Sequence, residues 1–131
     1  MPTRPLSPHL SVYQMSRYTL ATSIFNRLTG LALSAGLLLL VYWLLAVASG
    51  ARAHARAAQL LSLPLMKLVY IALIVAFSYH LVAGVRHLVW DSGRALERAQ
   101  SRRSAWLVLV LSLLLSVGIA CGAWLAGSHA P

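Results

Sequence analysis

Three long hydrophobic stretches, separated by short polar connectors, dominate the pattern of the chain. No Lys, Arg, Asp or Glu occurs between Arg27 and Arg52, between Lys67 and Arg86, or after Arg103. Each stretch is long enough for a transmembrane helix, which needs about 20 predominantly apolar residues. These stretches predict transmembrane helices at about 21–48, 63–90 and 105–126.

Local signals at the ends of these stretches support the same division. Pro64 suits the first turn of the second helix, because proline there gives up a backbone N–H that would be unpaired anyway. Ser104 can cap the third helix with its hydroxyl group. The connectors, 49–62 and 91–103, are short. We expect one all-α membrane domain over 1–131, because lipid cannot satisfy an open backbone.

Composition excludes a soluble domain. The chain is 60% hydrophobic and 10% charged, with a mean hydropathy of +0.76, whereas soluble domains carry about 25% charged residues. A single cysteine, Cys121, lies in an apolar stretch. It can form neither an internal disulfide nor a cysteine-based metal site, and we interpret it as a small buried residue.

The charge of the chain carries information on orientation. The net charge is +9, from 11 basic and 2 acidic residues. The basic residues lie at the ends of the apolar stretches rather than on a polar domain, so they indicate topology and not nucleic-acid binding. They are most frequent at the N-terminal end and in the second connector. This bias predicts that the N-terminus faces the cytoplasm, or the matrix of a mitochondrion. Tryptophans lie near the predicted span ends, as in an aromatic belt: Trp43, Trp90, Trp106 and Trp124.

The first 20 residues are polar and contain no apolar segment typical of a cleaved signal peptide. Pro5 and Pro8 favour an extended backbone. We expect residues 1–20 to form an arm that docks on a partner, although composition alone also fits a disordered tail.

The second predicted helix carries ionisable residues where they are costly, which marks a candidate functional site. At 100° per residue, His80, Gly84, His87 and Asp91 share one face. Imidazole is a common axial ligand of haem iron, and Gly84 leaves room for a flat ring. His87 lies nearer the rim of the membrane, where it and Arg86 could meet haem propionates.

A structural interpretation of the same residues stays open. His80 could instead hydrogen-bond a neighbouring helix, and Arg86 and Asp91 could be interfacial anchors. The remaining histidines, His9, His54 and His129, lie outside the predicted spans. Ligation of an iron by two histidines would therefore require a second subunit.

The start of the first predicted helix holds a second polar group of residues. Ser23 and Arg27 are four residues apart and share a face that Gly30 continues. Hydroxyl and guanidinium groups can donate hydrogen bonds to the carbonyl oxygens of a quinone. The alternative is that Thr22 or Ser23 caps the helix and Arg27 extends its charge to the membrane surface.

Three motifs, taken together and in order, resemble the cytochrome b membrane-anchor subunit of succinate dehydrogenase. The family patterns are Arg-Pro-Leu-Ser-Pro-His-x-x-x-Tyr, Ser-Ile-x-His-Arg-x-Thr/Ser-Gly and His-x-x-x-Gly-x-Arg-His-x-x-x-Asp. This chain has them at residues 4–13, 23–30 and 80–91. Their spacing relative to the three spans also matches.

The resemblance implies roles by position. His80 corresponds to the axial ligand of haem b, whose second ligand comes from the small membrane-anchor subunit. Ser23 and Arg27 correspond to residues of the ubiquinone site, and Arg86 and His87 to residues near the haem propionates. The arm at 4–13 would lie against the iron–sulfur subunit, and the flavoprotein subunit would complete the complex.

One position departs from the family pattern. Asn26 stands where the family usually has histidine. Asparagine can donate a hydrogen bond to a quinone but cannot take up a proton near neutral pH. The resemblance therefore still includes Asn26 in the quinone site, but not as a proton relay.

The resulting expectation is a non-catalytic haem b subunit of succinate:ubiquinone oxidoreductase in a bacterial cytoplasmic membrane, or less commonly in the mitochondrial inner membrane. Alternatives are an anchor of a quinol:fumarate reductase, a scaffold without haem, or a small transporter subunit. The last would need polar residues through all spans, and the first and third have few.

Overall fold

The computed structural model describes residues 17–95 and 97–128, except for the side chains of residues 17–19 and 98. Of the expected docking arm, residues 1–16 lie outside the described residues, whereas residues 17–20 belong to the first helix, so the predicted end of the arm at residue 20 is wrong. The described chain forms four helices: α1 (Arg17–Ala48), α2 (Ala51–Leu61), α3 (Pro64–Asp91) and α4 (Arg98–Ser128). The expectation of an all-α chain with three membrane-spanning helices is confirmed, because α1, α3 and α4 are each long and apolar enough to cross a membrane.

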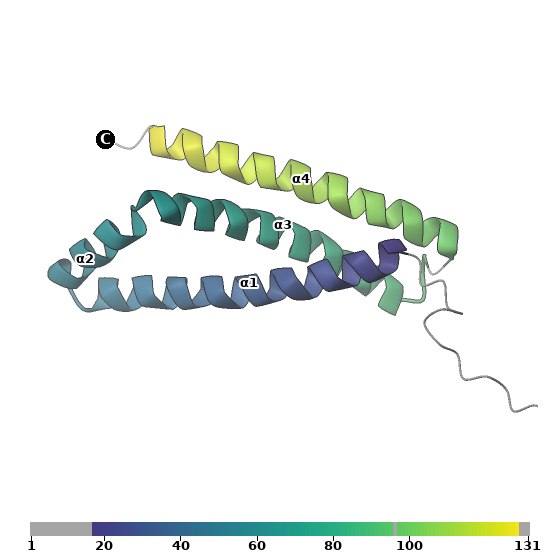
Figure 1. Ribbon diagram of the computed structural model, residues 1–131, viewed down its shortest axis with the longest axis horizontal. Helices are drawn as coiled ribbons and strands as arrows, with labels where there is room; N and C mark the ends of the chain where they lie inside the picture. Colours follow the sequence, from purple (N-terminus) through teal and green to yellow (C-terminus); the bar gives the residue numbers. More distant parts are fainter. Residues whose placement is uncertain (1–16, 96, 129–131) are drawn as a thin grey trace, which may run out of the picture.

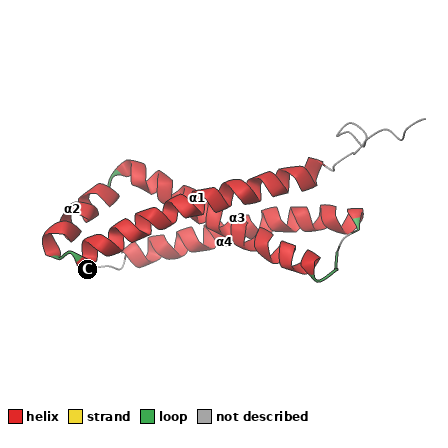
Figure 2. Cartoon of the chain, turned by 90° about the horizontal axis from the view of Figure 1, so that it is seen from below, coloured by secondary structure: helices red, strands yellow, loops and turns green. Residues whose placement is uncertain are grey.

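The three long helices run antiparallel to their neighbours, with α3 between α1 and α4 (Figure 1). The start of α1, the end of α3 and the start of α4 lie at one end of the bundle. Helix α2 and the end of α4 lie at the opposite end (Figure 1). The view from below shows that the bundle is elongated, with the long helices crossing near their middles (Figure 2). Helix α3 therefore holds the fold together.

Small side chains line the interfaces of α3. Ala76, Ala83, Ala105 and Ser112 are all buried. Small residues allow membrane helices to approach closely, and close packing replaces the hydrophobic driving force that lipid does not supply. Large apolar side chains face outward instead. Leu31, for example, is 70% exposed, as expected where lipid or another subunit covers the surface.

Helix α2 is a difference from the sequence prediction, in which residues 49–62 form only a connector. Its 11 residues are too short to span a membrane. They are amphipathic: Ala53 and Ala57 face the bundle, while Arg52 and Arg56 are exposed. A glycine with a positive φ of 96°, Gly50, makes the turn from α1 into α2. The pattern is typical of a helix at a membrane surface.

Two local predictions about helix starts have different outcomes. Pro64 does occupy the first turn of α3, as predicted. The predicted cap at Ser104 is wrong, because α4 begins at Arg98, six residues earlier. The Ser104 hydroxyl accepts a hydrogen bond from another helix instead, as described below. Since α1 begins at Arg17, Thr22 and Ser23 also lie inside a helix and do not cap it.

Candidate functional site

The imidazole of His80 lies against α1. Its Nδ1 atom is 3.1 Å from the backbone oxygen of Asn26 and 3.3 Å from the hydroxyl oxygen of Thr29. A carbonyl oxygen can only accept, so Nδ1 must carry the proton. The Thr29 hydroxyl can accept as well, because its own proton is directed to the backbone oxygens of Phe25 and Asn26. In the neutral ring, this tautomer leaves a lone pair on Nε2.

The glycine at the end of the first-helix motif makes this contact possible. A Cβ atom added to Gly30 would lie 3.1 Å from Cε1 of His80. This distance is tighter than an ordinary van der Waals contact, so any side chain at Gly30 would push the ring away. On α3, a Cβ added to Gly84 would meet nothing within 4 Å. The helix surface one turn from His80 is thus open on that side.

A second polar cluster joins all three long helices around Arg86, which is 7% exposed. Its Nε donates to the Ser104 hydroxyl at 2.9 Å, and Nη1 donates to the Thr22 hydroxyl at 3.1 Å. Nη2 donates to the backbone oxygen of Ser101 at 3.0 Å. The guanidinium carbon lies 4.0 Å from the ring centre of Trp90. Arg86 thus links α3 to both α1 and α4.

The partners of Arg86 are neutral. Among the described residues no carboxylate forms an ion pair with it, and the two acidic residues, Asp91 and Glu97, are exposed. A charged group in a membrane domain is costly unless it is well bonded. The hydroxyl, carbonyl and aromatic contacts supply that bonding. The expected role of Arg86 near haem propionates stays a prediction. The structure adds that its guanidinium N–H groups already donate hydrogen bonds within the chain.

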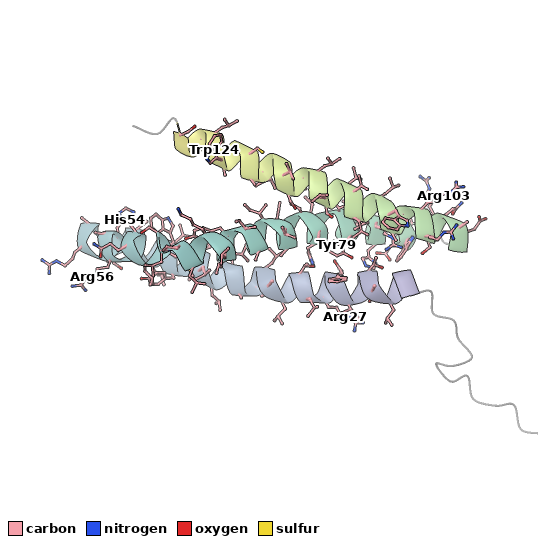
Figure 3. All side chains as sticks on the ribbon, turned by 45° about the horizontal axis from the view of Figure 1, so that its top comes forward. Arg27, His54, Arg56, Tyr79, Arg103 and Trp124 are labelled. Atoms are coloured by element: carbon pink, nitrogen blue, oxygen red, sulfur yellow. The ribbon has the colours of Figure 1, made fainter. Side chains whose placement is uncertain are left out.

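Tyr79 strengthens the same junction and was missed from the sequence. Its hydroxyl donates to the backbone oxygen of Thr22 at 3.2 Å, and its ring contacts Phe25 edge to face. Tyr79 is 7% exposed and lies between α1 and α3 (Figure 3). Sequence spacing alone places Tyr79 next to His80 but gives no sign of its partner.

His87 and Asp91 continue the predicted face toward the end of α3. His87 is partly buried, and its ring packs edge to face on Trp90 with 5.3 Å between ring centres. Asp91 is exposed. His87 is two turns from His80 along the helix and shares none of its hydrogen bonds.

The predicted quinone residues of α1 separate onto two sides. Asn26 is part of the α1–α3 contact through its backbone oxygen, and its side-chain Oδ1 is buried without a hydrogen-bond partner among the described residues. Arg27 is exposed and points away from α3 (Figure 3). Ser23 is partly buried. Within this chain the structure therefore brings Asn26, but not Arg27, to His80.

These groups define the chemistry that the site can perform. Among residues 17–95 and 97–128, no group of three or more His, Cys, Asp or Glu could hold a metal ion. Cys121 is exposed on α4, so its predicted burial is wrong for this chain alone. What the described residues offer is one imidazole nitrogen with a free lone pair and one unpaired amide oxygen, both near the α1–α3 contact.

Among the described residues, the fold and site define a membrane-embedded subunit with three spans and a single imidazole at the contact between α1 and α3. The chain belongs to the family described as succinate dehydrogenase/fumarate reductase transmembrane subunit, which matches residues 1–119. This confirms the resemblance found in the three sequence motifs.

Curated relatives carry the same assignment. The chain is 40% identical over 114 residues to the succinate dehydrogenase cytochrome b556 subunit of Paracoccus denitrificans, covering 87% of each chain. It is 42% identical over 119 residues to the mitochondrial cytochrome b560 subunit of Bos taurus, covering 89% of this chain and 70% of the relative. A Rickettsia felis cytochrome b556 subunit is 33% identical over 114 residues, covering 87% of this chain and 88% of the relative.

The geometry of Arg86 generates a prediction about stability. Arg86→Lys keeps the charge but loses the planar donor group that reaches two other helices. We expect a loss of about 2–4 kcal/mol in the free energy of unfolding, since one hydrogen bond from a charged group contributes about 1.5–3 kcal/mol. Titration with a denaturing detergent measures this loss.

The matched control is Arg103→Lys. Arg103 is exposed on the outer end of α4 (Figure 3), so this change should stay within about 0.5 kcal/mol of the parent protein. Equal effects of the two substitutions would contradict a linking role for Arg86.

Proposed function

We propose that this chain is the haem b-carrying membrane-anchor subunit of a succinate:ubiquinone oxidoreductase. In this role it holds the flavoprotein and iron–sulfur subunits at the membrane and contributes part of the site where ubiquinone is reduced. The observation that carries the proposal is the position of the His80 imidazole, whose Nδ1 lies within hydrogen-bond distance of α1, so that the neutral ring would keep a lone pair on Nε2.

The residues present fit a haem group. Histidines that bind metals usually donate their second ring N–H to a carbonyl or carboxylate, which fixes the tautomer and ring orientation. His80 has this arrangement, with the Asn26 carbonyl as acceptor. The open surface beside Gly84 leaves space on the same helix. When bound, haem b supplies one-electron redox chemistry, and His80 would hold its iron through Nε2.

The second axial ligand would come from the small membrane-anchor subunit. Within the described residues, His54 lies at the opposite end of the bundle against Trp43, and His87 packs on Trp90. Neither approaches His80. The positions of the three described histidines therefore support the prediction that this chain provides half of a shared site.

The contribution to the ubiquinone site would come from Ser23, Asn26 and Arg27. The buried Oδ1 of Asn26 lacks a partner, and an unsatisfied buried polar atom costs about 1–3 kcal/mol. A polar ligand or a partner subunit would remove this cost. Arg27 is exposed, lies seven residues after the start of the apolar candidate span at Leu20, and has no hydrogen-bond or ion-pair partner among the described residues. Arg27 would donate hydrogen bonds across a subunit interface.

Reduction of ubiquinone requires two electrons and two protons. Asn26 cannot deliver a proton, because an amide does not titrate near neutral pH. The residues of this chain would bind and orient the quinone by hydrogen bonds, and the protons would come from water or from other subunits.

The cellular location follows from the family and the charge pattern. Relatives include bacterial and mitochondrial proteins. The bias of basic residues toward the N-terminal end would place that end in the cytoplasm of a bacterium, where the soluble subunits would dock.

The opposite reaction, fumarate reduction by a quinol, is the second candidate function, because the family description includes fumarate reductase.

The first test is His80→Ala in the purified complex. We expect the absorption bands of low-spin haem to disappear or shift, because the iron loses the imidazole nitrogen, while the complex still inserts into the membrane. An unchanged reduced-minus-oxidised spectrum would contradict the ligand assignment. If the unmutated complex itself had no haem absorption bands, the result would instead favour a scaffold without haem.

The second test concerns the quinone site. Arg27→Ala should slow quinone reduction by about 10-fold or more, because a lost hydrogen bond from a charged group is worth about 1.5–3 kcal/mol. Succinate oxidation with a soluble artificial acceptor should remain near the parent rate. Equal losses in both assays would indicate an assembly defect and contradict a role at the quinone site.

The third test concerns the orientation of His80. Thr29→Val keeps the shape of the side chain but removes the hydroxyl that accepts from Nδ1–H. We expect haem to be retained with a higher midpoint potential, because the imidazole becomes a weaker donor and stabilises ferric iron less. Thr29→Ser keeps a hydroxyl and should restore the parent potential. Equal potentials in all three proteins would exclude this contact as a positioning element.

A further inference from the structure

A cavity of about 480 Å³ lies at the end of the bundle opposite the His80 and Arg86 groups. Its lining residues lie on α1, α2 and α3, and α2 connects the end of α1 to the start of α3 (Figure 1). Residues of all three helices line it, including Gly36, Leu40, Trp43, Ala58, Tyr70 and Leu73. Its volume falls in the range of about 300–1,000 Å³ that is typical of sites for small molecules.

The walls of this cavity are mainly apolar, and the indole N–H of Trp43 is the one side-chain donor in them without a hydrogen bond among the described residues. The two hydroxyl groups that line it already donate within the chain. Tyr70 donates to the backbone oxygen of Leu61 at 2.9 Å, and Ser62 donates to that of Gln59 at 2.9 Å. A quinone ring has two carbonyl oxygens that need donors, whereas most of the lining residues are leucine, alanine or glycine. The walls therefore suit a hydrocarbon chain better than a quinone head group.

The charge around the cavity has one sign. Lys67 is exposed and precedes Tyr70 by three residues on α3, so the two side chains are neighbours on the helix surface. Arg52 and Arg56 are exposed on α2, and Arg56 extends away from the end of the bundle (Figure 3). Between residues 49 and 70 the chain has no Asp or Glu. An anionic group would therefore meet attraction and no repulsion from this part of the chain.

The position of the cavity matches the depth of a lipid molecule. Trp43 and Tyr70 line it, and such aromatic side chains favour the boundary between head groups and acyl chains. The amphipathic α2 lies at the same end, as a helix at the membrane surface does. From the surface inward, the chain presents basic side chains, then aromatic rings, then leucines.

We propose that this cavity binds one acyl chain of an anionic phospholipid, whose phosphate is held near Lys67. The bound lipid would fill the space between α1, α2 and α3 and hold α2 against the bundle. This site is separate from the haem and quinone sites, and the proposal does not depend on them.

The test uses the whole complex, transferred into nanodiscs that contain equal amounts of phosphatidylglycerol and phosphatidylcholine. Native mass spectrometry then measures the lipid that stays bound after release from the disc. We expect the parent complex to retain one more phosphatidylglycerol molecule per copy of this chain than the Ala58→Phe complex, because the phenylalanine ring occupies the cavity. The matched control is Ala55→Phe on the same helix, where the side chain is exposed and does not line the cavity.

The charge at the rim is tested by Lys67→Gln. The preference for phosphatidylglycerol over phosphatidylcholine should fall about fivefold. One basic residue near an anionic lipid surface contributes about 1 kcal/mol, which corresponds to a change of this size. The haem spectrum of each variant reports whether the complex is still assembled.

Several results would overturn the proposal. Equal lipid retention in Ala58→Phe and Ala55→Phe would show that the cavity is not the binding site. Retention of a quinone in place of phospholipid would identify a different ligand. Dissociation of another subunit in Ala58→Phe alone would identify a protein segment as the occupant.

Discussion

The contact between the His80 ring and Gly30 is the constraint on which the rest of the site depends. The ring approaches α1 so closely that a Cβ at Gly30 would lie 3.1 Å from it. At this distance Nδ1 reaches the Asn26 carbonyl, and the tautomer of the imidazole follows from that hydrogen bond. Two motifs that are about 50 residues apart in the sequence therefore form one unit, in which α1 orients the nitrogen that α3 presents.

The Arg86 cluster maintains the geometry that this contact requires. Its hydrogen bonds reach Thr22 on α1 and Ser101 and Ser104 on α4, and they lie toward the end of α3 beyond His80. In lipid, helix association relies on packing and on such polar links rather than on apolar burial. The small residues along α3 allow the helices to approach closely. The hydrogen bonds of the Arg86 guanidinium then fix how α1 and α4 are placed against α3.

Much of this architecture can be predicted from the sequence. Span length and the absence of charges give the three transmembrane helices, and helical spacing puts His80 deep and His87 nearer the rim. Helix α2 was missed because 11 residues with two arginines resemble a polar connector, and their amphipathic period becomes meaningful only once the bundle end that they cover is known. Ser104 was misassigned as a cap because a serine before an apolar stretch has the same local pattern in either role. Thr29 was found only as a position of the first-helix motif, and Tyr79 gave no signal, since their partners lie on other helices.

The central claim is that this chain supplies one of two imidazole ligands, through Nε2 of His80. The most direct test is pulsed electron paramagnetic resonance of the oxidised complex, assembled with ¹⁵N-histidine in this chain only. We expect a low-spin ferric centre coupled to one ¹⁵N ligand nitrogen from this chain and one ¹⁴N ligand nitrogen from a partner subunit. Coupling to two ¹⁵N ligand nitrogens, or to none, would contradict it.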